Sequence, residues 1–503
     1  MPFPSINWKP VSRAVISFSA LVAANGLLAL SARAATPGTP TPEQDDPREA
    51  VLAGLDAHAD RYADVAMQIW DWAEVGYQEE QSSALLQEEL RAAGFEIESG
   101  VAGMPTAFVA SYGSGKPIIG ILAEYDALPG ISQAAVAERQ PVAEGGAGHA
   151  CGHHLFGAGS VAAGVAVKEW LEATGHGGTI RVYGTPAEEG GAGKVYMVRS
   201  GLLDDLDVAL HWHPSDRNSA RAGRSLANKS AKFRFSGYSA HAAGAPHRGR
   251  SALDGVEAMN YMVNLMREHV PQETRIHYVI TQGGYAPNVV PDFSEVWYYV
   301  RHPDAATALG IFDRVAAAAE GAALGTGTTM EYEVIHGIYD LMPNVALAEV
   351  VDRNLRAVGG VEYSETELAF AEAIQATFQG GPSRQLGSER EIAPFGVDPA
   401  GGGSTDVGDV SWVIPTAGLS TATWVPGTSA HSWQAVAAGG TSIGAKGMMV
   451  AAKTLAATAI ELFQNPEVLA RAAEELEERR GPNFVYSALL GERPPPLDYR
   501  RLP

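Results

Sequence analysis

Four apolar segments in the first half of the chain constrain its fold most strongly. All four are rich in strand-forming residues and carry few charges: "TAFVASY" (106–112), "PIIGILAEYD" (117–126), "TIRVYGTP" (179–186) and "DVALHWHP" (207–214). A small-residue helical pattern over 159–174 separates the second segment from the third. Strands that are apolar throughout and alternate with helices are typical of a sheet buried on both faces. The sequence therefore predicts an α/β domain built on a mostly parallel sheet.

The hydrophobic pattern changes near residue 225. Four later segments alternate between apolar and polar residues, as half-exposed strands do; they are "SAKFRFSGYSA" (230–240), "RIHYVIT" (275–281), "SEVWYYVR" (294–301) and "TMEYEVI" (329–335). On the second of these segments, Ile276, Tyr278 and Ile280 are expected on one buried face. Two helical patterns interleave to give the order β-α-β-β-α-β, which predicts a ferredoxin-like unit with one open face or edge.

From about residue 339 the chain again shows helical and loop-like patterns. A length of 503 residues suits about two to three domains. We therefore expect a large α/β domain that is interrupted by a smaller inserted one.

The charge balance argues against two classes of partner. The chain has 58 acidic residues (Asp plus Glu) against 36 basic ones (Lys plus Arg), a formal net charge of −22. Such an excess of negative charge disfavours binding to nucleic acid or to an anionic membrane surface.

The N-terminal segment is typical of a secretory signal peptide. Lys9 and Arg13 precede an apolar run over 14–30, and Ala32-Arg33-Ala34 forms a small-x-small cleavage site. We expect a signal peptide over 1–34, a Pro/Thr-rich linker over 35–47, and an exported protein, periplasmic or secreted, that contacts no membrane after cleavage. The alternative is an uncleaved membrane anchor, because the apolar run approaches spanning length.

Cys151 is the only cysteine of the chain, and it lies in "GHACGHHLFGAG" (148–159) beside His153. A single cysteine cannot form an internal disulfide, so in an exported protein it is either buried and inert or bound to a metal. The glycine-flanked loop enters the helix predicted downstream, where the helix dipole would favour a thiolate. Two interpretations of this segment are therefore open: Cys151 and the histidines bind a metal, or the histidines lie near a buried thiol by chance.

Polar residues also follow three of the predicted strands. The pairs are Glu124 and Asp126, Glu188 and Glu189, and His211 and His213. Adjacent carboxylates in a turn point in different directions, so one can bind a metal while the other acts as a base. An Asp in this position commonly orients a metal-bound histidine. Because the carboxyl ends of parallel strands meet at one edge of a sheet, these side chains and Cys151 can converge on a metal site.

Several of these motifs resemble those of a known family. The segments "GHACGHHLFGAG", "TPAEEGGAGK", "SGYSAHAAGAPHRGRSALDG", "APNVVPD" and "STDVGDVSW" are similar to those of the di-metal amidohydrolases that include hippurate hydrolases, auxin-conjugate hydrolases and carboxypeptidases of the aminoacylase type. The resemblance extends over residues 48–465. It implies a zinc-peptidase-like catalytic domain with an inserted lid and dimerisation domain. The expected parts are the catalytic domain over 48–225 and 339–480, the lid over 226–338, and a C-terminal tail over 481–503.

The resemblance also implies the roles of the metal ligands. By motif match, Cys151 would bridge two divalent ions, zinc or manganese, with cobalt as a further candidate. The remaining expected ligands are His153 and His213 on one ion, and Glu189 and His431 on the other. His211 is the alternative to His213, or else a neighbour that contacts the substrate.

The implied activity is hydrolysis of the amide bond in N-acyl or aryl-amide conjugates of amino acids by a metal-activated water. Glu188 would be the general base, and Asp126 would orient His153. His241, supplied by the facing subunit, and Asn288 would stabilise the oxyanion. Arg301 is a weaker candidate for binding a substrate carboxylate.

The resemblance leaves three points open. A homodimer is expected, but a second, different subunit is also compatible with the sequence. A dipeptidase of the same family is an alternative activity. A non-catalytic metal-binding partner subunit is a third reading, although every expected ligand type and Glu188 are present.

Overall fold

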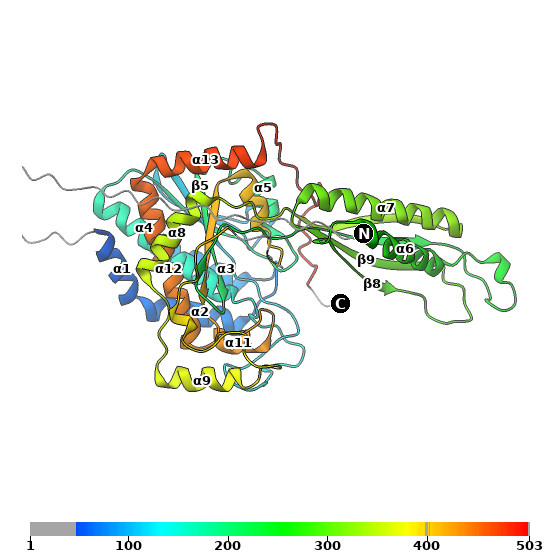
Figure 1. The fold of residues 1–503 in the computed structure, drawn as a ribbon, viewed down its shortest axis with the longest axis horizontal. Coiled ribbons are helices and arrows are strands. Elements are labelled where there is room, and N and C mark those ends of the chain that lie inside the picture. The colour runs from blue at the N-terminus through cyan, green and yellow to red at the C-terminus, as the bar shows by residue number, and fades with distance from the viewer. Residues whose placement is uncertain (1–46, 398–400, 402, 501–503) are drawn as a thin grey trace, which may run out of the picture. The chain divides into compact units, whose positions relative to one another are not determined.

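The computed structural model of the chain describes residues 47–397, 401 and 403–500 (Figure 1). The expected signal peptide over 1–34 and the linker up to residue 46 lie outside the described residues, as do residues 501–503 of the expected tail.

A seven-stranded sheet forms the centre of the large α/β part. Its strands are β1 Glu96–Ser99, β2 Phe108–Ser114, β3 Ile118–Ala123, β4 Gly178–Gly184, β5 Val208–Ser215, β6 Ser219–Ala220 and β11 Thr416–Ala422. The strand order is β1-β2-β4-β3-β5-β11-β6. The central strands β4, β3, β5 and β11 run parallel, and the outer pairings are antiparallel. The predicted α/β fold with a parallel sheet at its centre is therefore confirmed.

Two strands differ from the sequence-based expectation. Strand β2, from the segment "TAFVASY", pairs antiparallel with β4 rather than joining the parallel set. Strand β11 was not predicted at all, yet it lies parallel to β5, between β5 and the short edge strand β6. Its sequence, "TAGLSTA", contains one large apolar residue, so it lacks the run of Val, Ile and aromatic residues by which buried strands are recognised.

Helices cover both faces of this sheet (Figure 1). Alternate residues of β3 point to opposite faces: Ile119 and Ile121 pack into the larger core, and Ile118 and Leu122 into the smaller one. Helices on the larger core are α1 Pro47–Ala57, α2 Ala59–Trp72, α3 Glu80–Ala92, α4 His153–Thr174, α8 Val345–Val358, α12 Ser442–Gln464 and α13 Pro466–Arg480. Helices on the smaller core are α5 Gly193–Arg199 and α10 Val407–Val413. Two further helices, α9 Glu365–Gln375 and α11 Trp433–Gly439, share a third cluster.

One described helix, α12, is long and apolar enough to cross a membrane, but 83% of its apolar window is buried inside the structure. Such burial is typical of a core helix in an α/β fold.

A second sheet is formed by the segments inserted between β6 and α8. Its elements are β7 Ala227–Ser236, α6 Ala252–Met266, β8 Arg275–Gln282, β9 Phe293–His302, α7 Ala305–Thr326 and β10 Thr329–Ile338. The sheet order is β10-β7-β9-β8, and all of its pairs are antiparallel. Helices α6 and α7 pack against one face through a core that includes Phe233, Phe235 and Tyr298.

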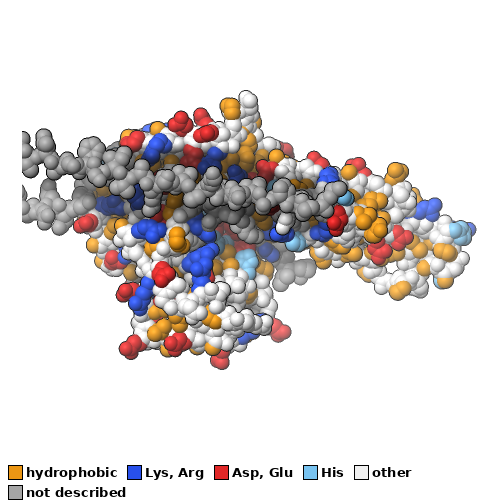
Figure 2. Space-filling view, in the orientation of Figure 1, with side chains coloured by type: hydrophobic (Ala, Val, Ile, Leu, Met, Phe, Trp, Pro, Cys, Tyr) orange, Lys and Arg blue, Asp and Glu red, His pale blue; other side chains and the backbone are white. Residues whose placement is uncertain are grey.

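The edge strand β8 departs from its predicted burial. Ile276 is buried as expected, but Tyr278 and Ile280 are 37% and 40% exposed. The reason is that β8 has a neighbour on one side only, so its far end is left uncovered. Val279 and, on α6, Leu265 are also exposed, and hydrophobic side chains are visible at the surface of this part of the chain (Figure 2).

Candidate active site

The candidate site lies at the carboxyl ends of β3, β4 and β5, where ligands bind in open parallel sheets. Glu124 and Asp126 directly follow β3, and the turn with Glu188 and Glu189 follows β4. His213 is near the end of β5. Cys151 stands two residues before α4, whose N-cap, Gly152, has a φ of +78° that favours glycine.

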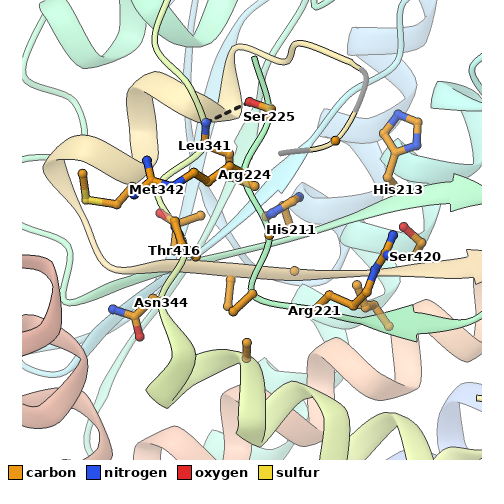
Figure 3. Close-up of a pocket in the computed structure, with 18 of the residues that line it drawn as sticks. His211, His213, Arg221, Arg224, Ser225, Leu341, Met342, Asn344, Thr416 and Ser420 are labelled. Atoms are coloured by element: carbon orange, nitrogen blue, oxygen red, sulfur yellow. Dashed lines mark hydrogen bonds between the residues drawn. The ribbon is translucent and has the colours of Figure 1, made fainter. Parts of the chain in front are cut away.

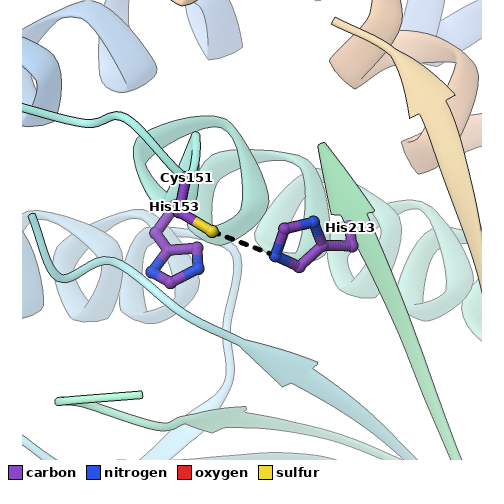
Figure 4. Close-up of side chains that lie close together, drawn as sticks. All are labelled: Cys151, His153 and His213. Carbon is purple, nitrogen blue, oxygen red and sulfur yellow. Dashed lines mark hydrogen bonds between the residues drawn. The ribbon is translucent and has the colours of Figure 1, made fainter. Parts of the chain in front are cut away.

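The structure brings the predicted ligand residues together in two groups that share Cys151. One group joins Cys151, His153 and His213, and the other joins Cys151, Glu189 and His431. Within each group the ligand atoms lie within 4.8 Å of one another. Figure 4 shows the first group, in which Cys151 Sγ is 3.4 Å from His213 Nε2.

A third group was not predicted. It consists of Glu124, His153 and Glu188 and overlaps with the first group through His153. Glu124 Oε2 lies 3.1 Å from His153 Nε2. The sequence indicated Glu124 only as an acidic residue at a strand end, so its approach to His153 is new information from the structure.

The chemistry of these side chains fits a bound cation. Three buried atoms that face the groups, Glu124 Oε2, His153 Nε2 and Glu189 Oε1, form no hydrogen bond of regular geometry among the described residues. Their ion-pair contacts stay within the groups, because Glu124 Oε2 is 3.1 Å from His153 Nε2 and Glu189 Oε1 is 3.0 Å from His431 Nε2. Burial raises the pKa of the Cys151 thiol well above its usual range, so a nearby cation is what would keep it as a thiolate. Thiolate, imidazole and carboxylate ligands together suit a divalent transition metal.

Asp126 connects two of the predicted ligands. Its Oδ1 lies 2.9 Å from His153 Nδ1, and its Oδ2 accepts a hydrogen bond of 2.9 Å from the backbone N–H of Glu189. Burial opposes the charge of Asp126, but the positive charge of His153 and the hydrogen bond to it hold the pKa of Asp126 below its usual value. One carboxylate therefore orients the imidazole and also anchors the turn that carries Glu189.

Replacement of Asp126 by Asn is expected to weaken metal binding about 10- to 100-fold, because the loss of such a supporting carboxylate typically has this effect. Competition with a chromophoric chelator measures the affinity. Asp205→Asn is the matched control, since Asp205 is paired with Arg181 away from the site. Equal metal affinities in the two variants would contradict the role given to Asp126.

A buried ion cluster that the sequence did not indicate lies beneath the site. Lys194 Nζ is 2.6 Å from Glu124 Oε1 and 2.7 Å from Asp406 Oδ1, and all three side chains are buried. Asp406 Oδ2 also accepts a hydrogen bond from the backbone N–H of Lys194. Burial opposes the charge on Lys194, but Asp406 and Glu124 together raise its pKa. The lysine therefore holds Glu124 in place beside His153.

A cavity of about 230 Å³ adjoins the first ligand group (Figure 3). His211, His213, Arg221 and Arg224 are among the residues that line it, and the two arginines were not singled out in the sequence. His211 belongs to none of the three ligand groups. Burial lowers the pKa of His211 to about 4, so it is neutral near pH 7. His213, rather than His211, is the histidine of this pair that lies beside Cys151.

None of the predicted residues of the inserted part belongs to the three ligand groups. His241 and Asn288 are exposed and adjacent, since Ala242 donates a backbone hydrogen bond to the carbonyl of Asn288. Arg301 lies on β9, with its guanidinium carbon 5.3 Å from the centre of the Tyr299 ring. Arg301 does not line the cavity beside His213.

An α/β fold with acidic, histidine and cysteine side chains gathered at the end of its central sheet is the arrangement expected of a metal-dependent enzyme. The chain belongs to the peptidase family M20/M25/M40, whose family model matches residues 120–386. The chain is therefore a hydrolase of this family, as its motifs predicted.

Known relatives agree with this assignment. The chain is 43% identical to one of the subunits, designated B, of the p-aminobenzoyl-glutamate hydrolase of Escherichia coli, over 84% of this chain and 93% of that protein. It is 29% identical to the Xaa-Arg dipeptidase of Mus musculus, over 88% and 96%. A dinuclear metal-binding peptidase of the M20 family from Bacillus subtilis has the same fold, with a TM-score of 0.54 and 16% identity over 81% and 99% of the two chains.

Proposed function

We propose that the protein hydrolyses the amide bond of N-acyl or aryl-amide conjugates of amino acids, with p-aminobenzoyl-glutamate as the first candidate substrate. The observation that carries this proposal is the pair of ligand groups sharing Cys151. The similarity to the p-aminobenzoyl-glutamate hydrolase of Escherichia coli, which extends over 93% of the matched polypeptide, supports the substrate class.

In this proposal Cys151, His153 and His213 would hold one divalent ion, and Cys151, Glu189 and His431 would hold another. Such ions would supply Lewis acidity toward the attacking water and the amide carbonyl. Zinc, manganese and cobalt all remain candidates, because the ligand set mixes soft and hard donors.

Glu188 is the proposed general base. It is half-buried, and burial together with the carboxylates of Glu124 and Glu189 raises its pKa well above the usual range. A carboxylate with a raised pKa is a better acceptor for the proton of the attacking water. The same carboxyl group then gives this proton to the leaving amine when the C–N bond breaks.

We further propose that residues 226–338 are a ferredoxin-like lid and dimerisation domain inserted into a catalytic domain over 48–225 and 339–480, followed by a tail from residue 481. Its β-α-β-β-α-β order and the exposed apolar edge at β8 support this. The edge suits pairing with a second copy in a homodimer. His241 of the facing subunit and Asn288 would stabilise the oxyanion, and Arg301 would bind a substrate carboxylate.

Hydrolysis of p-aminobenzoyl-glutamate by the purified protein, loaded separately with zinc, manganese and cobalt, tests the main proposal. Release of p-aminobenzoate that requires an added metal supports it. No release with any of the three metals, by a protein shown to hold metal, would contradict the assignment of this substrate to the chain acting alone. Because the names of the Escherichia coli relatives distinguish two subunits of the hydrolase, such a result would lead next to a search for a second polypeptide.

A dipeptidase is the second candidate, because the similarity to the Xaa-Arg dipeptidase extends over 96% of that protein. Comparing kcat/KM for p-aminobenzoyl-glutamate with kcat/KM for dipeptides that end in arginine separates the two activities. A higher value for the dipeptides would favour this alternative.

We also propose that the protein is exported and cleaved after Ala34, on the basis of the signal-like segment in its sequence. Mass spectrometry of the protein recovered from the host's periplasmic or culture fraction tests this. A mature chain that starts at Ala35 supports export, whereas an intact N-terminus in the cytosolic fraction contradicts it.

Metal binding should stabilise the fold measurably. A divalent ion at about 100 times its Kd is expected to raise the free energy of unfolding by about 2.7 kcal/mol. Cys151→Ser should remove most of this gain, because each tenfold loss of affinity costs about 1.4 kcal/mol. Thermal unfolding with zinc or manganese measures the effect. Magnesium is the matched control, since it prefers oxygen ligands. An equal gain in the parent and in Cys151→Ser would show that the ion binds elsewhere.

A further inference from the structure

The C-terminal tail, described over 481–500, packs against the rest of the chain before it reaches the candidate site. Tyr486 Oη donates a 2.7 Å hydrogen bond to Asp409 Oδ1, and Leu489 is buried. The tail approaches β10 so closely that a Cβ added to Gly337 would lie 2.6 Å from the carbonyl carbon of Leu489. The tail is therefore an integral part of the fold.

Two arginines then connect the tail to elements on either side. Arg199 of α5 donates to the carbonyl oxygens of Gly491 and Arg493, at 2.7 and 2.9 Å. Arg493 in turn donates to the carbonyl oxygens of Val334 and Ile335 in β10, at 2.9 and 2.6 Å. These contacts fix the path of the tail between α5 and β10.

The last described residues of the tail contact the turn that carries the proposed base. Tyr499 Oη and Arg500 Nη2 both donate to the backbone carbonyl of Glu189, at 3.0 and 2.6 Å. Tyr499 also packs edge-on against Tyr77, with ring centroids 5.7 Å apart. A Cβ on Gly76 would lie 2.3 Å from Tyr499 Oη, so Tyr499 packs directly against the backbone at Gly76.

The turn itself has a backbone that needs support. Ala187 has a φ of +57°, which residues other than glycine rarely adopt and which the surrounding contacts must maintain. Its backbone N–H donates to the buried carboxylate of Glu79, and the N–H of Glu189 donates to Asp126. Among the described residues, both hydrogen bonds to the carbonyl of Glu189 come from the tail.

We propose that Tyr499 and Arg500 are positioning residues for the Glu188–Glu189 turn. Tyr499 and Arg500 bind the carbonyl of Glu189, whereas Glu79 and Asp126 accept from the backbone N–H groups of the same turn. Together these contacts fix the turn and therefore the direction of the Glu188 and Glu189 side chains. A displacement of about 1 Å in such a group can cost about 10²-fold in rate. The catalytic part of this inference rests on the proposed function, whereas the part that concerns metal retention does not.

The double variant Tyr499→Phe/Arg500→Gln in the full chain tests the inference. Its kcat for p-aminobenzoyl-glutamate should fall about 10- to 100-fold with little change in KM, and its ions should be lost faster to a chelator. Arg500→Lys, which keeps a charged donor, should restore much of both properties. Arg471→Gln is the matched control, because Arg471 is an exposed arginine of α13 and the change in charge is the same.

Metal content after timed dialysis against a chelator is the readout that does not depend on turnover. Faster metal loss in the double variant than in the control, with an unchanged unfolding midpoint of the metal-free protein, supports the positioning role. If metal loss and kcat match the control, the proposal is overturned. It is also overturned if Arg500→Lys is as impaired as the double variant and both have a lower unfolding midpoint in the metal-free state, because the tail then acts only through packing. A parent protein that holds metal but does not cleave p-aminobenzoyl-glutamate would overturn the proposed substrate, and metal loss would still decide the positioning role.

Discussion

Glu188→Gln is expected to lower kcat by about 10²- to 10⁴-fold, the usual contribution of a positioned general base. The glutamine has the same shape but cannot accept the proton of the attacking water. Because the proton transfer occurs only in the transition state, kcat and kcat/KM should fall together and KM should change little. Steady-state kinetics with p-aminobenzoyl-glutamate measures both constants.

The metal content of Glu188→Gln distinguishes a base from a ligand. Glu188 also belongs to the third ligand group, with Glu124 and His153. Retention of the parent's metal content together with the loss of kcat would support the role of a base. Loss of an ion would show that Glu188 is a ligand instead, and a kcat within a few-fold of the parent would exclude both roles. Glu88→Gln, on the exposed side of α3, is the matched control.

Lys194→Met should destabilise the fold by about 3 to 5 kcal/mol, because it leaves the carboxylates of Glu124 and Asp406 buried without their cation. The side chains of this cluster are no more than 1% exposed, so water cannot compensate for the missing charge. Urea unfolding followed by far-UV circular dichroism measures the change.

Two further variants make this result specific. Adding Asp406→Asn to Lys194→Met should recover part of the lost stability, since it removes one of the uncompensated charges. Lys168→Met breaks a surface pair with Glu172 and should cost at most about 1 kcal/mol. If Lys194→Met cost no more than Lys168→Met, the buried cluster would not contribute to stability.

The sequence predicted the parts of the site that carry a chemical signature. Cysteine is used once, and histidine or acidic pairs stand at the ends of apolar strands, so Cys151, His213 and Glu189 could be named from residue type and position. The structure places these residues in shared groups.

The features that could not be predicted from the sequence have one thing in common: each depends on contacts that leave no recognisable pattern of residue types. The tail segment "ERPPPLDYR" is polar and Pro-rich, and its contacts with Glu189 go to a backbone carbonyl, which leaves no pattern in the sequence. Lys194 is an ordinary lysine in sequence, and only the fold shows that Asp406, more than two hundred positions later, is its partner. Strand β11 is buried through small residues, so apolar periodicity does not reveal it.

The segment inserted between β6 and α8 enters and leaves the large α/β part at neighbouring positions. The first and last strands of the insertion pair with each other, and Asn228 is opposite Ile338 in their register. The two ends are therefore already as close as cross-strand partners, about 5 Å between Cα atoms. The insertion is therefore separable in topological terms: a short turn could replace residues 228–338 while β5 and β11 remain paired.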